Sequence, residues 1–64
     1  MRITHFRQRM DEEFGPARAA ALAHDHVFAA LGGRTVDAAL EAGIDTKRVW
    51  TVVCAEFDVP EERR

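Results

Sequence analysis

The sequence lacks the features of disulfide-stabilised, membrane-spanning and secreted proteins. It contains one cysteine, Cys54, so no internal disulfide can form, and a reducing cytosol fits best. No run of about 18 apolar residues occurs, as a membrane-spanning helix would need. The basic residues 1–9 are not followed by the apolar stretch of a signal peptide. We therefore expect a cytoplasmic protein with no membrane partner.

The sequence also lacks a strong excess of either positive or negative charge. Nine basic and eleven acidic residues give a net charge of −2, which provides no electrostatic footprint for nucleic acid. The 64 residues are 47% hydrophobic and 31% charged, a globular composition. A chain of this length forms one domain with a limited interior, so we expect a single helical domain over residues 1–64.

Helical periodicity is the main signal in the first half of the chain. Apolar residues of the first segment follow i, i+3, i+4 spacing and predict a helix over about 4–14. Gly15 and Pro16 then end that helix and begin the next. Apolar spacing continues to Leu31, and Gly32 with Gly33 provides a stop. The second helix is therefore predicted over about 16–31.

The second half predicts two shorter helices. Thr35 is a good N-cap for a helix over about 36–42, and Asp45 for one over about 46–57. Gly43 is expected to hold a left-handed turn between them. Residues 61–64 form a charged tail that we expect to fray. No segment alternates long enough to be a strand, so the predicted fold is an all-α, compact single-domain bundle of about four short helices.

The last two helices carry the spacing of a helix-turn-helix. That motif needs a small residue, a Gly four positions later, and aliphatic residues six and nine positions after the Gly. Ala39, Gly43, Val49 and Val52 meet these requirements. The helix pair within 35–54 therefore predicts a helix-turn-helix-like arrangement.

The fourth helix presents two conflicting faces. Lys47 and Arg48 occupy its first turn, where the helix dipole disfavours cations, and with Thr51 they form a possible binding surface. A DNA-reading side in this register would also include Trp50 and Cys54. Yet Trp50 belongs to an apolar arc of about 140°, which predicts a structural position in the core. The arc consists of Val49, Trp50, Val53, Cys54 and Phe57.

The histidines and carboxylates do not predict a metal site, a cofactor or catalysis. His24 and His26 are two positions apart and point to different sides of a helix. We expect His26 to be partly buried and hydrogen-bonded, and Asp25 to be a structural partner of Arg18 or of the 32–34 turn. Cys54 lies on an apolar face, where burial makes a thiol inert. No enzymatic activity, metal or cofactor is expected.

Several short stretches together resemble a known family. They are Asp25-His26-Val27, Leu31-Gly32-Gly33-Arg34-Thr35, Ala39-Leu40, Gly43, Val49-Trp50, Cys54 and Val59-Pro60. The chain resembles short uncharacterised actinobacterial proteins, the domain of unknown function family 3046. The resemblance covers nearly the whole chain and implies a bacterial setting, but it brings no activity and no site residues.

The function predicted from the sequence is a non-enzymatic interaction module in the cytosol. A small domain with a high aromatic and aliphatic content has surplus apolar surface, which often marks an interface. The favoured partner is an unknown protein or a second copy of the chain. The alternative is a helix-turn-helix-type nucleic-acid-binding protein that uses residues 35–54.

Overall fold

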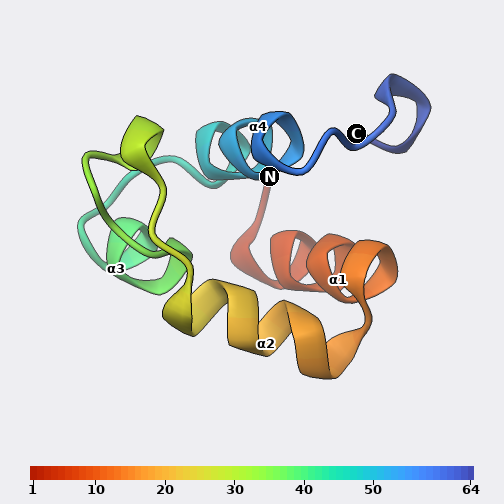
Figure 1. The fold of residues 1–64 in the computed structure, drawn as a ribbon, viewed down its shortest axis with the longest axis horizontal. Coiled ribbons are helices and arrows are strands. Elements are labelled where there is room, and N and C mark those ends of the chain that lie inside the picture. The colour runs from red at the N-terminus through yellow and green to blue at the C-terminus, as the bar shows by residue number, and fades with distance from the viewer.

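The protein folds into four α-helices and two short 3-10 turns, as the computed structural model of residues 1–64 shows (Figure 1). The helices are α1 (Ile3–Phe14), α2 (Pro16–Asp25), α3 (Val36–Glu41) and α4 (Thr46–Glu56), and the turns are η1 (Ala29–Leu31) and η2 (Glu61–Arg63). The sole β-type pairing is one isolated bridge between Phe28 and Arg34. The predicted all-α fold is confirmed.

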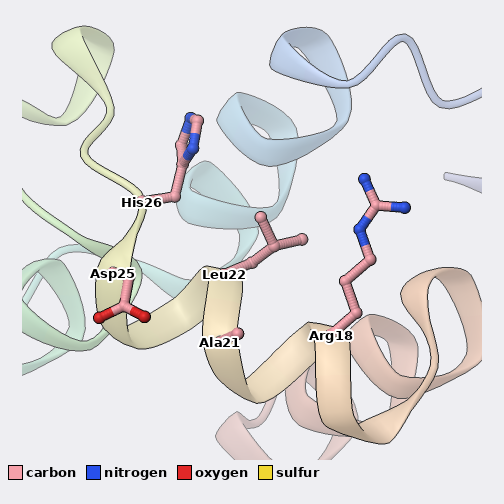
Figure 2. Close-up of a pocket in the computed structure, with 5 residues that line it drawn as sticks. All are labelled: Arg18, Ala21, Leu22, Asp25 and His26. Carbon is pink, nitrogen blue, oxygen red and sulfur yellow. The ribbon is translucent and has the colours of Figure 1, made fainter.

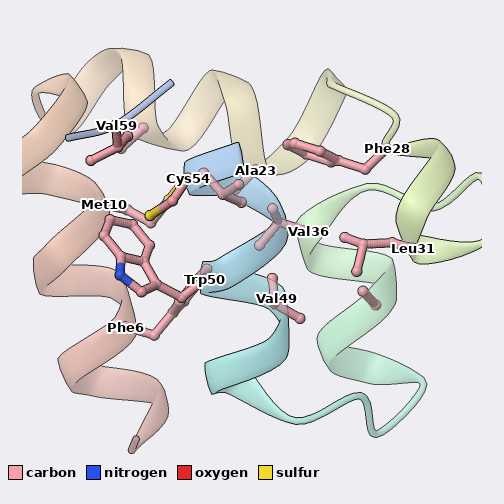
Figure 3. Packing of buried hydrophobic residues seen from close by; sticks show 13 residues of the cluster. Phe6, Met10, Ala23, Phe28, Leu31, Val36, Val49, Trp50, Cys54 and Val59 are labelled. Atoms are coloured by element: carbon pink, nitrogen blue, oxygen red, sulfur yellow. The ribbon is translucent and has the colours of Figure 1, made fainter. Parts of the chain in front are cut away.

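The four helices enclose one core. α1 packs against α2 and α4, and α3 packs against the same two helices from the other end of the molecule (Figure 1). Each helix therefore turns one face inward. Side chains from all four helices and from the connecting segments meet there (Figure 3). The buried residues are Phe6, Met10, Ala19, Ala23, Phe28, Leu31, Val36, Ala39, Val49, Trp50, Val53, Cys54 and Val59.

Local signals fix most helix ends. Gly15 adopts φ +85° between α1 and α2, a left-handed conformation that favours glycine, and Pro16 occupies the first turn of α2. Thr35 Oγ1 accepts a hydrogen bond of 3.1 Å from the Ala38 N–H and so caps α3. Asp45, the other predicted cap, makes no side-chain capping hydrogen bond. At the start of α4 the Thr46 hydroxyl donates a hydrogen bond to the Met1 carbonyl.

The prediction of one helix over 16–31 is wrong. α2 ends at Asp25, and His26 and Phe28 are extended. Phe28 then pairs with Arg34 across the glycine turn: its N–H donates to the Arg34 carbonyl at 3.0 Å, and its carbonyl accepts from the Gly33 N–H at 3.1 Å. These bonds replace the helical ones. They also turn the chain so that Phe28 and Leu31 reach the same core as Ala19 and Ala23, whereas a straight helix would place Phe28 on the side opposite Ala19.

The shorter α2 buries a different face from the one that a long helix would bury. Ala19 and Ala23 are its buried residues, one helical turn apart, and Leu22 is half-buried beside them. Alanine has no side chain beyond Cβ, so α1 and α3 can approach this face closely. The packing of α2 therefore depends on small residues rather than on a wide apolar surface.

The C-terminal residues are more ordered than the predicted frayed tail. Glu61–Arg63 form η2, and the Arg63 guanidinium pairs with the Glu13 carboxylate of α1 at 3.0 Å. Arg9 donates to the Arg63 carbonyl at 3.0 Å. The hydrogen bonds that the Arg63 guanidinium donates to the Glu13 carboxylate raise the pKa of Arg63 above its ordinary value. Partners on α1, separated by some fifty residues in sequence, hold the segment.

Gly43 adopts φ +85° in the turn between α3 and α4, as the sequence predicted. We expect Gly43→Ala to lower the free energy of unfolding by about 1 kcal/mol or more, because an L-residue is strained in that conformation. A Cβ here would meet nothing within 4 Å, so the cost comes from the backbone alone. Urea denaturation followed by circular dichroism measures it. Gly43→Asn is the matched control and should cost less, since asparagine tolerates this region better. Equal stability of wild type and Gly43→Ala would refute the assignment.

Candidate functional site

The helix α4 separates a core face from an exposed face. Val49, Val53 and Cys54 are fully buried, and Trp50 is 4% exposed. Lys47, Arg48 and Thr51 are exposed and lie beyond the edge of the core face that Trp50 and Cys54 form. The structure therefore places Trp50 in the core and keeps the three predicted binding residues together at the surface. We call Lys47, Arg48 and Thr51 the α4 basic face.

The two cations of the α4 basic face have no acidic partner. Among the other basic residues, Arg7 lies 2.8 Å from Asp37, Arg63 lies 3.0 Å from Glu13 and Arg64 lies 3.9 Å from Glu61, whereas Arg2, Arg9, Arg18 and Arg34 form no ion pair either. Lys47 and Arg48 form no ion pair, although they sit in the first turn of α4, where the dipole costs about 0.3–1 kcal/mol per cation. Their position is unfavourable for folding and leaves both charges free for a ligand.

Thr51 is fixed toward its own helix. Its Oγ1 donates a hydrogen bond of 2.9 Å to the Lys47 carbonyl one turn earlier. This bond leaves the lone pairs of the hydroxyl available as acceptors. Thr51 thus forms a neutral, short-chained position beside the two cations.

A pocket of about 400 Å³ lies next to the α4 basic face, between α4, the start of α1 and the C-terminal segment. We call it the α1–α4 pocket. Its charged and titratable residues are His5, Lys47 and Arg64, and its apolar residues are Met1, Trp50 and Cys54. Thr51 completes the lining. The sequence did not predict this pocket, because His5 and Arg64 come from opposite ends of the chain.

Trp50 is held between the pocket and the core. Its ring meets the Phe6 ring edge-on, at 6.1 Å between centroids and 85° between planes, and the Arg9 guanidinium lies 5.7 Å from its centroid. Its Nε1 is the only buried side-chain polar atom without a hydrogen-bond partner. Figure 3 shows this nitrogen on the side of the ring that faces α1.

Cys54 lies behind the same pocket but is not suited to nucleophilic chemistry. It is fully buried, and burial raises the pKa of its thiol, although the nearby Arg64 charge acts in the opposite direction. A thiol with a raised pKa carries little thiolate at neutral pH.

We therefore expect iodoacetamide to alkylate Cys54 on the order of ten-fold more slowly, or slower still, in the native protein than in urea. The rate is measured by mass spectrometry at pH 8, with free cysteine as the control for reagent activity. Equal native and denatured rates would show that the thiol is accessible and reactive.

A second depression, on α2, contains the other predicted structural residues (Figure 2). Its volume is about 290 Å³, near the lower limit of about 300 Å³ for small-molecule sites. Asp25 points away from Arg18 and forms no hydrogen bond or ion pair with it, contrary to the sequence prediction; nor does Asp25 bond to the 32–34 turn. Arg18 instead lies 5.9 Å from the Phe14 ring centroid. These residues do not converge on a ligand.

His26 has a structural environment. Its ring packs against Phe28 at 4.6 Å and Phe57 at 5.1 Å between centroids, and its Nε2 lies 3.4 Å from Glu56 Oε2. The ring thereby links the end of α2 to the end of α4. No three side chains of the metal-ligating types converge anywhere in the structure. None of the helices has the length and apolar character needed to cross a membrane.

Comparison with known proteins identifies the family. The model of a family described as "Protein of unknown function (DUF3046)" matches residues 1–62. The chain belongs to this family, as the resemblance in sequence indicated.

One curated relative is informative about origin. It is the Mycobacterium tuberculosis protein named "Putative envelope-preserving system protein", which is 42% identical to this chain over 36 residues. The match covers 56% of this chain and 13% of the relative, so most of that protein has no counterpart here. The relative is consistent with an actinobacterial origin. No solved structure matches the chain.

Proposed function

We propose that this domain is a non-enzymatic interaction module whose α4 basic face binds an acidic surface of a partner protein. The observation that carries the proposal is the pair of exposed, unpaired cations, Lys47 and Arg48, in the first turn of α4. Folding gains nothing from them there, since the helix dipole favours acids at this position. Binding to carboxylates would neutralise both charges.

A protein partner is favoured over DNA by the neighbouring residues. In a helix-turn-helix the first helix crosses the phosphate backbone, and the second presents one continuous face to the bases. Here the charged residues of α3 are Asp37 and Glu41, which phosphates would repel. Trp50 and Cys54, which the DNA-reading face would need, are buried. Nucleic-acid binding remains the second candidate because the helix-turn-helix spacing is retained across Gly43.

Charge reversal on the α4 basic face tests the proposal. We expect Lys47→Glu/Arg48→Glu to keep or slightly raise the melting temperature, by the dipole effect of about 0.3–1 kcal/mol per position. The same variant should lose the partner proteins that co-purify with tagged wild type from an actinobacterial lysate, as quantified by mass spectrometry. Arg18→Glu, which reverses an exposed arginine on α2, is the control and should retain them.

Three outcomes would count against the proposal. Retention of the same partners by the double variant would remove the α4 basic face from the interaction. Unfolding of the double variant would make Lys47 and Arg48 structural. A gel shift of double-stranded DNA that weakens steeply with salt and disappears in the double variant would favour the nucleic-acid candidate.

A further inference from the structure

The α1–α4 pocket differs in charge from every other depression on the molecule. The four other pockets each include at least one carboxylate side chain, namely Asp25, Asp45, Asp11, or Asp37 with Glu41. The α1–α4 pocket has none, and its ionisable side chains apart from the buried Cys54 are basic. It is also among the larger ones, at about 400 Å³. Its volume lies within the range of about 300–1,000 Å³ typical of ligand sites.

The interior of this pocket is apolar, and its ionisable side chains come from three segments. Trp50 contributes an aromatic surface that is held against Phe6, and Cys54 adds a neutral thiol. His5 comes from α1, Lys47 from α4 and Arg64 from the C-terminal segment. Arg64 is itself positioned by a 2.7 Å hydrogen bond from its Nε to the Val59 carbonyl. A ligand of this pocket must therefore have an apolar group in contact with Trp50 and acidic groups on either side of that apolar group.

We infer that the α1–α4 pocket anchors a large apolar side chain, such as phenylalanine, from a partner segment in which acidic residues flank that side chain. The inference deepens the proposed function and rests on it: the α4 basic face attracts the acids, and the pocket gives specificity. Lys47 and Thr51 belong to both surfaces, so one short segment reaches both. An apolar anchor in a pocket surrounded by charge pairs is a common arrangement at interfaces.

Trp50 provides the measurement, because it is the only tryptophan of the chain and lines the pocket. Three probes are titrated against its emission: the peptide acetyl-Glu-Asp-Phe-Glu-Asp-amide, the same peptide with alanine in place of phenylalanine, and 4-phenylbutyrate. We expect the phenylalanine peptide to bind about ten-fold more tightly than the alanine peptide, from burial of the ring. 4-Phenylbutyrate should bind weakly but saturably.

Two matched variants locate the site. Thr51→Phe places a ring at the pocket and should abolish both the ten-fold preference and 4-phenylbutyrate binding. Ala55→Phe adds the same ring one turn along α4, at an exposed position that lines no pocket, and should leave both intact. Melting curves of both variants verify that they fold.

The outcomes separate the pocket from the α4 basic face. Equal affinities for the two peptides, with no saturable response to 4-phenylbutyrate, would overturn the pocket inference even if Lys47→Glu/Arg48→Glu weakens peptide binding. Saturable 4-phenylbutyrate binding that Thr51→Phe removes, without any peptide binding, would overturn the α4 basic face and leave the pocket as a ligand site. No response to any probe would overturn the pocket inference, whereas the α4 basic face is tested separately by the co-purification of partners with Lys47→Glu/Arg48→Glu.

Discussion

Trp50→Ala is expected to leave the protein largely unfolded at 25 °C. The indole is 4% exposed, packs edge-on against Phe6 and is covered by the Arg9 guanidinium. Truncation of a buried tryptophan to alanine commonly costs about 3–5 kcal/mol. A domain of 64 residues has a total stability of only about 3–10 kcal/mol, at roughly 0.05–0.15 kcal/mol per residue. One side chain therefore accounts for a large share of the total.

Circular dichroism at 222 nm during urea denaturation measures this loss. Val27→Ala is the control: Val27 is 57% exposed, and its truncation should change stability by no more than about 0.5 kcal/mol. Trp50→Phe keeps an aromatic ring and removes the unpaired Nε1, so it should lie between wild type and Trp50→Ala. A Trp50→Ala variant as stable as wild type would contradict the packing of α4 on α1.

Phe28→Ala should have the second largest effect, again about 3–5 kcal/mol. Phe28 is 1% exposed although it lies in an extended segment, and its ring packs against His26 and Phe57 at 4.6 and 6.2 Å between centroids. Its backbone also anchors the turn that ends at Arg34. Removal of the ring takes away the apolar contact that draws the loop into the core.

The same urea titration measures the effect of Phe28→Ala. His26→Ala is the matched comparison: it removes a half-buried ring from the same stack and should cost clearly less. A loss of less than about 1 kcal/mol in Phe28→Ala would mean that the loop does not use this ring as its anchor.

Those features of the fold that depend on neighbouring residues could be predicted from the sequence. The core face of α4 followed from apolar residues at helical spacing, and the ends of α1 and α3 from Gly15 and Thr35, whose effects are local. The exposed position of Lys47 and Arg48 followed from the same spacing. Local patterns therefore fixed three helices to within one residue at each end.

The remaining features depend on contacts between distant residues. The apolar period continues from Leu22 to Leu31, and only the pairing of Phe28 with Arg34 shows that the helix has ended. Similarly, the tail is held by Glu13 of α1, and the pocket combines His5 with Arg64. No spacing in the sequence encodes such contacts, so single-sequence reasoning could not find them.

The emission of Trp50 in the native protein tests most directly which face of α4 is buried. With Trp50 in the core and the α4 basic face free, native emission should be blue-shifted from that in urea and poorly quenched by acrylamide. Arg48→Glu should not change either property, since Arg48 is exposed and does not line the α1–α4 pocket with Trp50. A native emission equal to that of the denatured chain, with full quenching, would place Trp50 at the surface. That result would contradict the account and favour a recognition helix.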